Sequence, residues 1–411
     1  MFNSHQPINK LWINLCISGL SIFFFLVILE TCVRIFVPKY LWELRNPSAD
    51  WQLDLALGWV NKPNLDIAFL TDKGAISRFQ TNKDGLMPGT TRREREADIV
   101  RIMFFGDSTV VGRAIDQNKT VHADLQKILR SKGLNVEVIN AGVQGYSTDQ
   151  VLLRMRQLIP IYKPDIAIYG LCANDFDGNL ADIAHGLVKP KFVLDEKNGV
   201  VLKPLVKISP QIDDGSQNDW RKWIQCSASY RYFQPNIWVL RVKFEQWLER
   251  HDTDEYSLSA ESINGVNWQL VIALINEMKL CAESNNASFA FFKHPSIGEV
   301  WDSHVKSDHK LNQSHHARHA LEQRLVMIAE ENSISFCCLV DYFIRNSHRG
   351  PFHLLPRDPH CNAAGYELIA EKLADFLINS ESLLPEISSP SSKDLSKKNA
   401  INEISLLNKD I

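Results

Sequence analysis

The stretch "FFGDSTVVG", residues 104–112, ends the apolar run from Val100 to Phe105 and places a glycine, an acid and a hydroxyl in consecutive positions. An apolar run that stops at small and polar residues is typical of a buried strand leading into a turn. On its own, this stretch leaves two interpretations of Ser108: a nucleophile, or a polar residue in a turn.

Further runs of this kind recur along the chain. The sequence predicts strands at Arg101–Phe105, Val136–Asn140, Ile166–Leu171, Ser288–Phe292 and Ile334–Val340. Segments with apolar residues at every third or fourth position predict helices near 120–133, 148–159, 261–284, 316–332 and 362–377. Alternating apolar strands and helices predict an α/β fold whose parallel sheet is covered by helices on both faces.

We place this α/β domain at residues 99–379. Differences in composition define further segments before, within and after it. Residues 41–98 are a lead-in segment of loops and short strands that we expect to pack on the domain. Residues 176–250 are an insertion that contains a hairpin signal at Asn198-Gly199, and we expect it beside the carboxyl ends of the strands. Residues 380–411 are rich in Ser, Lys and Asn and are predicted to be disordered.

Residues 1–40 contain the uncharged segment "LWINLCISGLSIFFFLVIL", residues 11–29. As a helix it is about 28 Å long, enough to cross the hydrocarbon layer of a membrane. We interpret it as a transmembrane anchor; a cleaved signal peptide and a buried core helix are the alternatives, and the residues that follow offer no small-residue cleavage site. Lys10 on one side and Arg34, Lys39 and Arg45 on the other do not fix the orientation.

Several classes of function are disfavoured by composition. The formal net charge of -3 and the lack of a long basic stripe argue against nucleic-acid binding. The eight cysteines include no C-x-x-C pair, which leaves a zinc ribbon or a thioredoxin-like site unsupported. His315, His316 and His319 could share a helix face, but no acid or cysteine nearby completes a metal site, so we expect a solvated helix start.

In an open parallel sheet, ligands bind beyond the carboxyl ends of the strands, so the polar residues after each apolar run are the candidate site. Four blocks follow the runs: Gly106-Asp107-Ser108, "NAGVQGYST" at 140–148, "LCANDF" at 171–176 and "RDPHCNAAG" at 357–365. Asp175 has no second acid at a defined spacing and is expected to be structural.

Attack by a serine on an acyl carbon needs a base, a carboxylate that holds the base, and donors for the oxyanion. Pro359 and the expected N-cap Asn362 keep Asp358 and His360 outside the last helix, where the carboxylate can reach the imidazole. The backbone N–H of a glycine and the side-chain amide of an asparagine are suitable oxyanion donors. Taken singly, these residues are equally a packing histidine, a turn glycine and a capping asparagine.

In their order and spacing, the four blocks resemble the SGNH (GDSL-type) hydrolase superfamily over residues 99–379. "LGW", "KPN" and "TN..G" in the lead-in are similar, more weakly, to membrane-anchored bacterial members. The resemblance implies a flavodoxin-like, three-layer α/β/α fold. It also implies that Ser108 is the nucleophile, that Gly145, Asn174 and the Ser108 backbone N–H are the oxyanion donors, and that Asp358 and His360 complete the triad.

Two positions depart from the family pattern. Cys172 stands where the third block usually has glycine, and one residue separates Asp358 from His360 where many members have two. Because cysteine has a side chain where glycine has none, we expect the backbone next to Asn174 to be less open to a substrate than in other members.

The resemblance implies a membrane-anchored serine esterase or acyl hydrolase that works through an acyl-enzyme without a metal or organic cofactor. Its substrates would be carboxylic esters, with O-acyl groups of envelope glycans and lipid-like esters as candidates, and its domain would lie outside the cytoplasmic membrane, in the periplasm. An O-acyltransferase that uses the same residues and a non-catalytic, polysaccharide-binding envelope protein are the alternatives. The sequence does not predict the acyl chain, the acceptor or the oligomeric state.

Overall fold

The computed structural model describes residues 6–37, 50–70, 76–88, 91–113, 115–184, 187–195, 199–203, 227–230, 232–233, 266–296, 299–300, 321–354, 360–380 and 383–384. Several predictions fall outside these residues. They concern Asp358, the histidines at 315–319, most of the insertion and nearly all of the tail.

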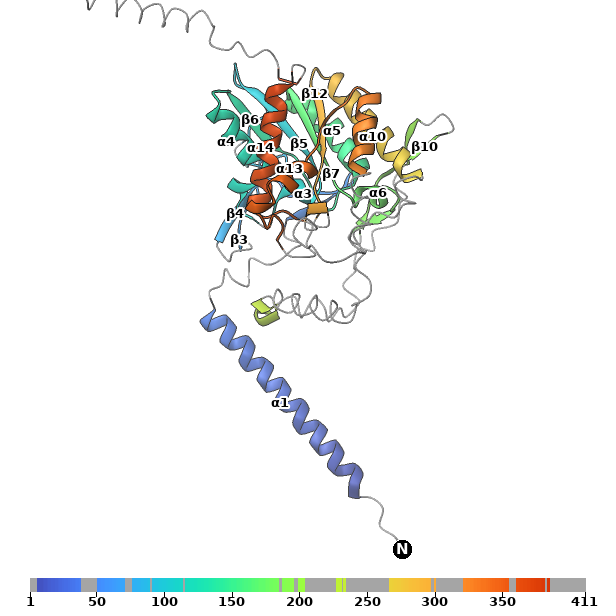
Figure 1. Ribbon diagram of the computed structural model, residues 1–411. Coiled ribbons are helices and arrows are strands. Elements are labelled where there is room, and N and C mark those ends of the chain that lie inside the picture. The colour runs from blue at the N-terminus through green and yellow to red at the C-terminus, as the bar shows by residue number, and fades with distance from the viewer. Residues whose placement is uncertain are drawn as a thin grey trace, which may run out of the picture.

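A five-stranded parallel sheet forms the centre of the molecule, with the strand order β13-β12-β7-β5-β6. Its strands are β5 (Val100–Gly106), β6 (Val136–Asn140), β7 (Ile166–Leu171), β12 (Ser288–Lys293) and β13 (Ser335–Cys337). Helices α4 (Val121–Ser131) and α14 (Ala363–Asn379) cover one face, and α5 (Thr148–Tyr162) and α10 (Val266–Glu283) cover the other (Figure 1). The predicted three-layer α/β/α fold is confirmed.

The central strand β5 shows why this sequence forms a doubly covered sheet. Every residue from Val100 to Gly106 is buried. Side chains of a strand alternate between its faces, so Ile102 and Phe104 join the core under α4 and α14, while Met103 and Phe105 join the core under α5 and α10. A strand with apolar layers on both sides therefore reads as an unbroken apolar run.

The fifth predicted strand is shorter than expected. Strand β13 ends at Cys337, and Val340 begins helix α13 (Val340–Arg345). The buried carboxylate of Glu322 accepts the backbone N–H groups of Leu339 and Val340, at 2.9 and 3.2 Å. An acid that binds the free N–H groups at a helix start stabilises the helix there, so the prediction of a strand through Val340 was wrong.

The lead-in folds into two antiparallel hairpins, β1 (Trp51–Asp54) with β2 (Gly58–Asn61) and β3 (Asp66–Leu70) with β4 (Ile76–Gln80). The buried Trp59 indole donates to the Gln144 carbonyl at 2.9 Å. The Asn61 amide donates to the Gly142 carbonyl at the same distance. Strand β2 therefore supports the loop that follows β6.

The described part of the insertion contains two further hairpins. Strands β8 (Ile183–Ala184) and β9 (Leu187–Val188) form one, and β10 (Lys191–Leu194) and β11 (Val200–Lys203) form the other, which the Asn-Gly signal predicted. Lys189 joins the insertion to the domain through a fully buried ion pair with Asp149 at the start of α5, at 2.6 Å.

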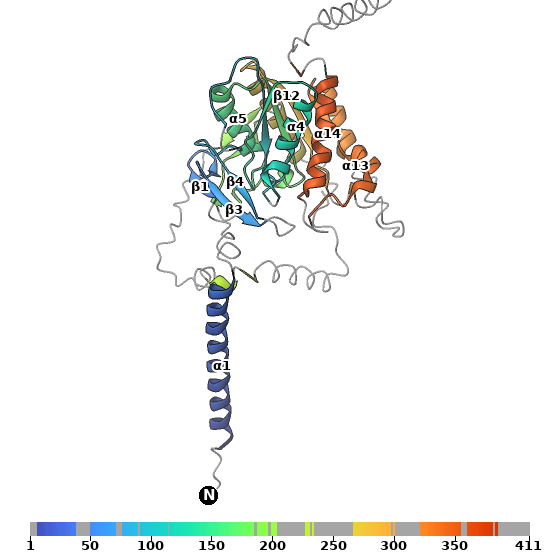
Figure 2. The same ribbon diagram turned by 90° about the vertical axis from the view of Figure 1, so that its left-hand side faces the viewer.

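Helix α1 (Gln6–Phe36) projects from the body as a single rod (Figures 1 and 2). Its segment Trp12–Phe36 is long and apolar enough to cross a membrane. By length and composition alone, a retained anchor and a signal sequence both satisfy this test.

Candidate active site

Ser108 is the first residue of the short helix α3 (Ser108–Val111), directly after β5. Asp107 caps this helix, because its Oδ1 accepts the Thr109 backbone N–H at 2.9 Å and the Thr109 hydroxyl at 2.7 Å. The preceding Gly106 is required by space, since a Cβ there would lie 2.4 Å from a methyl of Val110. The tight turn leaves the Ser108 side chain half-buried at the strand end, with no hydrogen bond from its hydroxyl to another described residue.

Asn174 lies close to the serine block although 66 positions separate Asn174 from Ser108 in the sequence. It follows β7, and its Nδ2 donates to the Asp107 Oδ2 at 3.3 Å. Asn174 occupies the N-cap position of α6 (Asp175–Gly178) but makes no side-chain capping bond. The amide therefore points to the residue before Ser108 rather than to its own helix.

Gly145 lies in the loop after β6 with a φ of 75°, a conformation that favours glycine. The loop is fixed beside the serine block, because the Val143 N–H donates to the Gly106 carbonyl at 3.1 Å. The first three sequence blocks thus meet at the carboxyl edge of the sheet, as predicted from the parallel strand order.

His360 stands two residues before Asn362, which caps α14 by accepting the Gly365 N–H at 3.1 Å, as the sequence predicted. The His360 carbonyl accepts the Leu354 N–H at 3.1 Å, and His353 pairs with Cys361 in an antiparallel bridge. These bonds close the base of a loop whose residues 355–359, with Asp358, lie outside the described part of the chain. The imidazole of His360 is half-buried.

A histidine that the sequence analysis did not consider places the His360 loop at the same edge. His294 directly follows β12, and its N–H donates to the Leu171 carbonyl at the end of β7 at 2.8 Å. The His353 ring packs edge-on against the His294 ring, with centroids 6.4 Å apart, and donates from Nε2 to the Pro295 carbonyl at 3.1 Å. Burial first, and then the nearby His353 and His360, hold the pKa of His294 well below its usual value.

The third block contains a second buried acid, Asp175, whose partner the sequence analysis missed. Its Oδ2 accepts the Tyr169 hydroxyl at 2.9 Å and the Cys172 N–H at 2.8 Å. Burial and then the charge of Asp107 raise the pKa of Asp175 well above its usual value. The acid near Asp175 is Asp107, which follows strand β5, so no spacing within the third block could reveal it.

Cys172 is compatible with this arrangement. Burial and the neighbouring Asp107 and Asp175 raise the pKa of its thiol well above the usual value, so the side chain is a neutral thiol. Its backbone N–H is already bound to Asp175.

A buried network under α3 connects the first two blocks, and sequence reasoning missed it as well. The Asn140 Oδ1 accepts the Gly142 N–H at 2.9 Å, while its Nδ2 donates to the Val110 carbonyl at 2.7 Å and to His122 Nδ1 at 3.1 Å. Nδ1 is therefore an acceptor and His122 is neutral, in agreement with a pKa that burial lowers to about 3. The sequence signal that could have indicated this network is Asn140 itself, a polar residue at the last position of the apolar strand β6.

Together, the carboxyl ends of β5, β6, β7 and β12 carry the serine, the glycine, the asparagine and the surroundings of His360. Within the described residues, no group of three His, Cys, Asp or Glu side chains could hold a metal ion. Such an edge offers a hydroxyl, amide donors and an imidazole, which are the groups of acyl transfer to serine.

Residues 102–209 match the family model of the GDSL-like lipases and acylhydrolases. This stretch, about a quarter of the chain, is similar to the GDSL (SGNH) hydrolases. It contains Ser108, Gly145 and Asn174 and ends before the His360 loop. The sequence comparison with curated proteins found no match.

Solved structures with a similar arrangement include three esterases or lipases. A catalytic mutant of an acetylxylan esterase from Geobacillus stearothermophilus is 14% identical, with 72% of this chain and 100% of that one covered and a TM-score of 0.37. A psychrotrophic esterase from Pseudoalteromonas sp. is 11% identical over 68% and 96%, with a TM-score of 0.34. A GDSL-like lipase from Bacteroides thetaiotaomicron is 12% identical over 69% and 90%, with a TM-score of 0.34. These overall similarities are low, so the family assignment rests on the sequence match.

Proposed function

We propose that this protein is a GDSL hydrolase that cleaves carboxylic esters through a Ser108 acyl-enzyme, with His360 as the general base and Asp358 as the carboxylate that orients it. The observation that carries the proposal is the contact of Asn174 Nδ2 with Asp107, because it brings an amide donor to the residue next to the nucleophile. The half-buried His360, held at the end of β12, supports its assignment as the base.

In the first half-reaction His360 accepts the Ser108 proton while Oγ bonds to the acyl carbon. The backbone N–H groups of Ser108 and Gly145 and the Asn174 amide stabilise the oxyanion. Collapse breaks the ester C–O bond, and the imidazolium returns its proton to the leaving alkoxide. Water then attacks the acyl carbon while His360 accepts its proton. Collapse breaks the bond between the acyl carbon and Oγ, the imidazolium returns the proton to Ser108, and the carboxylic acid is released.

The substrates that fit this chemistry are O-acyl esters of envelope glycans or lipid-like esters, with α1 as a retained membrane anchor and the domain on the periplasmic side. A reporter fused after Ile411 tests this location, and a signal confined to the cytoplasm would contradict it. Transfer of the acyl group to a sugar hydroxyl instead of water would use the same residues.

Hydrolysis of p-nitrophenyl acetate by the full chain in detergent tests the mechanism. We expect Ser108→Ala to lower the rate by about 10⁴-fold or more, because the nucleophile and base act as a unit. Ser131→Ala, at an exposed helix position where the hydroxyl donates to the Ile128 carbonyl, is the matched control and should keep full activity. Hydrolysis that survives Ser108→Ala, or a wild type that does not hydrolyse the ester, would exclude this mechanism. Transfer of acetate to an added sugar would identify a transferase.

A further inference from the structure

The carboxyl-terminal end of α1 makes a specific contact with a distant part of the chain. The Glu30 carboxylate accepts hydrogen bonds from the Ser227 hydroxyl at 2.7 Å, the Ala228 N–H at 2.8 Å, and the N–H and hydroxyl of Ser229 at 3.0 and 2.7 Å. Arg34, one turn along α1, forms an ion pair with the same carboxylate at 2.7 Å. Glu30 is thus the acceptor for three consecutive residues of the insertion.

Apolar contacts reinforce the same junction. Val33 of α1 and Ala228 are buried against each other at 4% and 0% exposure, in a cluster separate from the main core. Val37, Tyr232 and Phe233 pack around them. Residues 227–233 therefore dock on α1 by both a buried apolar contact and a network of charge-assisted hydrogen bonds.

The junction begins where the uncharged part of α1 ends. From Trp12 to Ile28 the large apolar side chains are 46% to 63% exposed, which is the pattern of a helix that faces lipid. The first acid after this stretch is Glu30, and an acid next to a hydrocarbon layer is costly unless it has partners. The contacts of Glu30 supply those partners, and a cleaved signal sequence would leave Ser227, Ala228 and Ser229 without them.

The contact between α1 and residues 227–233 also bears on which side of the domain faces the anchor. Figures 1 and 2 both show α1 on the side of the body where α14 begins, and the carboxyl end of α14 on the far side. His360 lies just before the start of α14, at the carboxyl edge of the sheet. The candidate active site is therefore on the side of the domain that faces the anchor.

We propose that residues 227–233 are a docking element that binds the membrane-exit end of α1 through Glu30 and holds the carboxyl edge of the sheet toward the lipid surface. The substrate is then an acyl ester borne by a molecule embedded in that surface. This inference rests on the proposed esterase function. Tyr230, Tyr232 and Phe233 place aromatic side chains at the membrane boundary, where such residues are favoured.

The test compares two esters with the same fluorescent leaving group, using the full chain reconstituted in phosphatidylcholine and phosphatidylglycerol vesicles. 4-Methylumbelliferyl acetate reaches the site from water, whereas 4-methylumbelliferyl oleate is presented by the bilayer. Two variants break the junction: Glu30→Gln removes the charge, and Ala228→Asp places a second carboxylate against Glu30. Glu283→Gln, at an exposed position of α10, is the control.

We expect both junction variants to lower kcat/KM for the oleate by about tenfold and to leave the acetate rate within about twofold, because the junction positions the site without contacting the reacting atoms. The control variant should match the wild type on both esters. Equal changes on the two esters, no change on either, or a wild type that cleaves only the acetate would overturn the docking proposal. Failure of the esterase proposal would look different, since acetate hydrolysis would be absent or independent of Ser108.

Discussion

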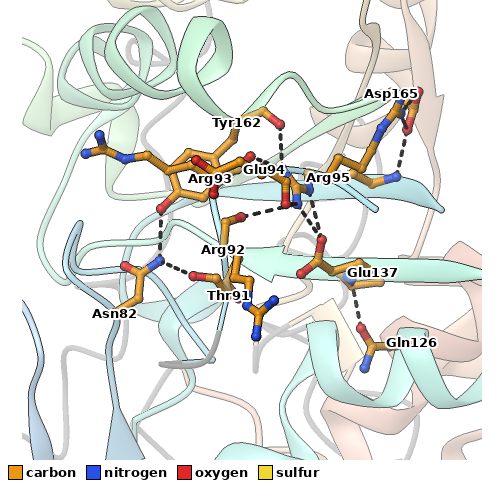
Figure 3. Close-up of polar contacts among 12 residues, drawn as sticks. Asn82, Thr91, Arg92, Arg93, Glu94, Arg95, Gln126, Glu137, Tyr162 and Asp165 are labelled. Carbon is orange, nitrogen blue, oxygen red and sulfur yellow. Dashed lines mark hydrogen bonds and ion pairs between the residues drawn. The ribbon is translucent and has the colours of Figure 1, made fainter. Parts of the chain in front are cut away.

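The two edges of the central sheet use polar residues in opposite ways. At the amino edge, the buried Arg101 of β5 uses its guanidinium donors on four backbone carbonyls and one carboxylate. It donates to the carbonyls of Arg92, Arg93, Glu94 and Tyr162 at 2.7 to 3.2 Å and to Glu137 at 2.9 Å (Figure 3). At the carboxyl edge, Asp175 Oδ1 and His294 Nε2 are buried without a hydrogen-bond partner among the described residues.

This difference fits a structural role for the amino edge and the catalytic role that we propose for the carboxyl edge. The hydrogen bonds of Arg101 hold the amino edge in one arrangement, and they leave none of its guanidinium donors for a ligand. Buried polar groups with unused hydrogen-bonding capacity and strongly shifted pKa values, as at the carboxyl edge, are typical of sites that act on a substrate. Changes at the two edges should therefore separate stability from activity.

The largest effect is expected from His360→Gln at the carboxyl edge. Loss of the base should lower kcat for p-nitrophenyl acetate by about 10⁴-fold, close to the loss in Ser108→Ala. The thermal midpoint should stay within about 2 °C of the wild type, because His360 binds Leu354 through its carbonyl and its ring is only half-buried. A stable variant with more than about a tenth of the activity would remove His360 from the mechanism.

Arg101→Met should have the converse result. Removing the guanidinium leaves buried carbonyls unpaired, and we expect a loss of about 3 to 5 kcal/mol in the free energy of unfolding. The folded fraction should keep its kcat, because Arg101 lies about 23 Å along β5 from Ser108. Urea unfolding and active-site titration of the soluble fraction measure the two effects, and Arg78→Met, at an exposed ion pair, is the control. A fall in kcat per titrated site would mean that the two edges are coupled.

The sequence predicted the sheet and the meeting of the first three blocks, because both follow from local patterns. Apolar runs that are buried on both faces are visible as runs, and parallel strands carry their carboxyl ends to one edge. The boundary at Val340 was missed because the carboxylate that starts α13 comes from Glu322, far from it in the sequence.

Contacts between strand ends were harder to predict for the same reason. The approach of Asp175 to Asp107, the position of His294 and the Asn140–His122 bond all depend on packing between segments at least 18 residues apart. The roles assigned to Ser108, Gly145, Asn174, Asp358 and His360 remain predictions that these variants test.

Asn174→Ala tests the oxyanion side of the carboxyl edge. We expect kcat to fall by about 10²-fold or somewhat more, the usual cost of one oxyanion donor, with little change in KM. Stability should be nearly unchanged, because the side chain is exposed and makes one long bond to Asp107. Asn179→Ala is a useful contrast, since that buried amide bonds to Thr148 and should reduce stability instead. A rise in KM with unchanged kcat would indicate that Asn174 binds the substrate rather than the oxyanion.

The smallest expected effect is on the pH dependence of stability. It comes from His122, which lies between the two edges. Its pKa of about 3 in the folded protein is below the unfolded value of 6.5, because burial and then the positive charge of Lys127 disfavour the charged ring. The unfolded chain therefore binds a proton below pH 6.5 that the folded protein does not. This contribution to stability is complete above pH 6.5 and is lost as the pH falls toward 3.

Between pH 6.5 and 5 the loss should be about 2 kcal/mol. His122→Asn keeps an acceptor for Asn140 and cannot titrate, so its urea midpoint should depend less on pH over this range. His348→Asn, at an exposed position, is the control and should retain the wild-type dependence. Because His294 is also buried and neutral, some acid sensitivity should persist in His122→Asn. Identical pH slopes in the wild type, His122→Asn and His348→Asn would show that the Asn140 network does not depend on a neutral His122.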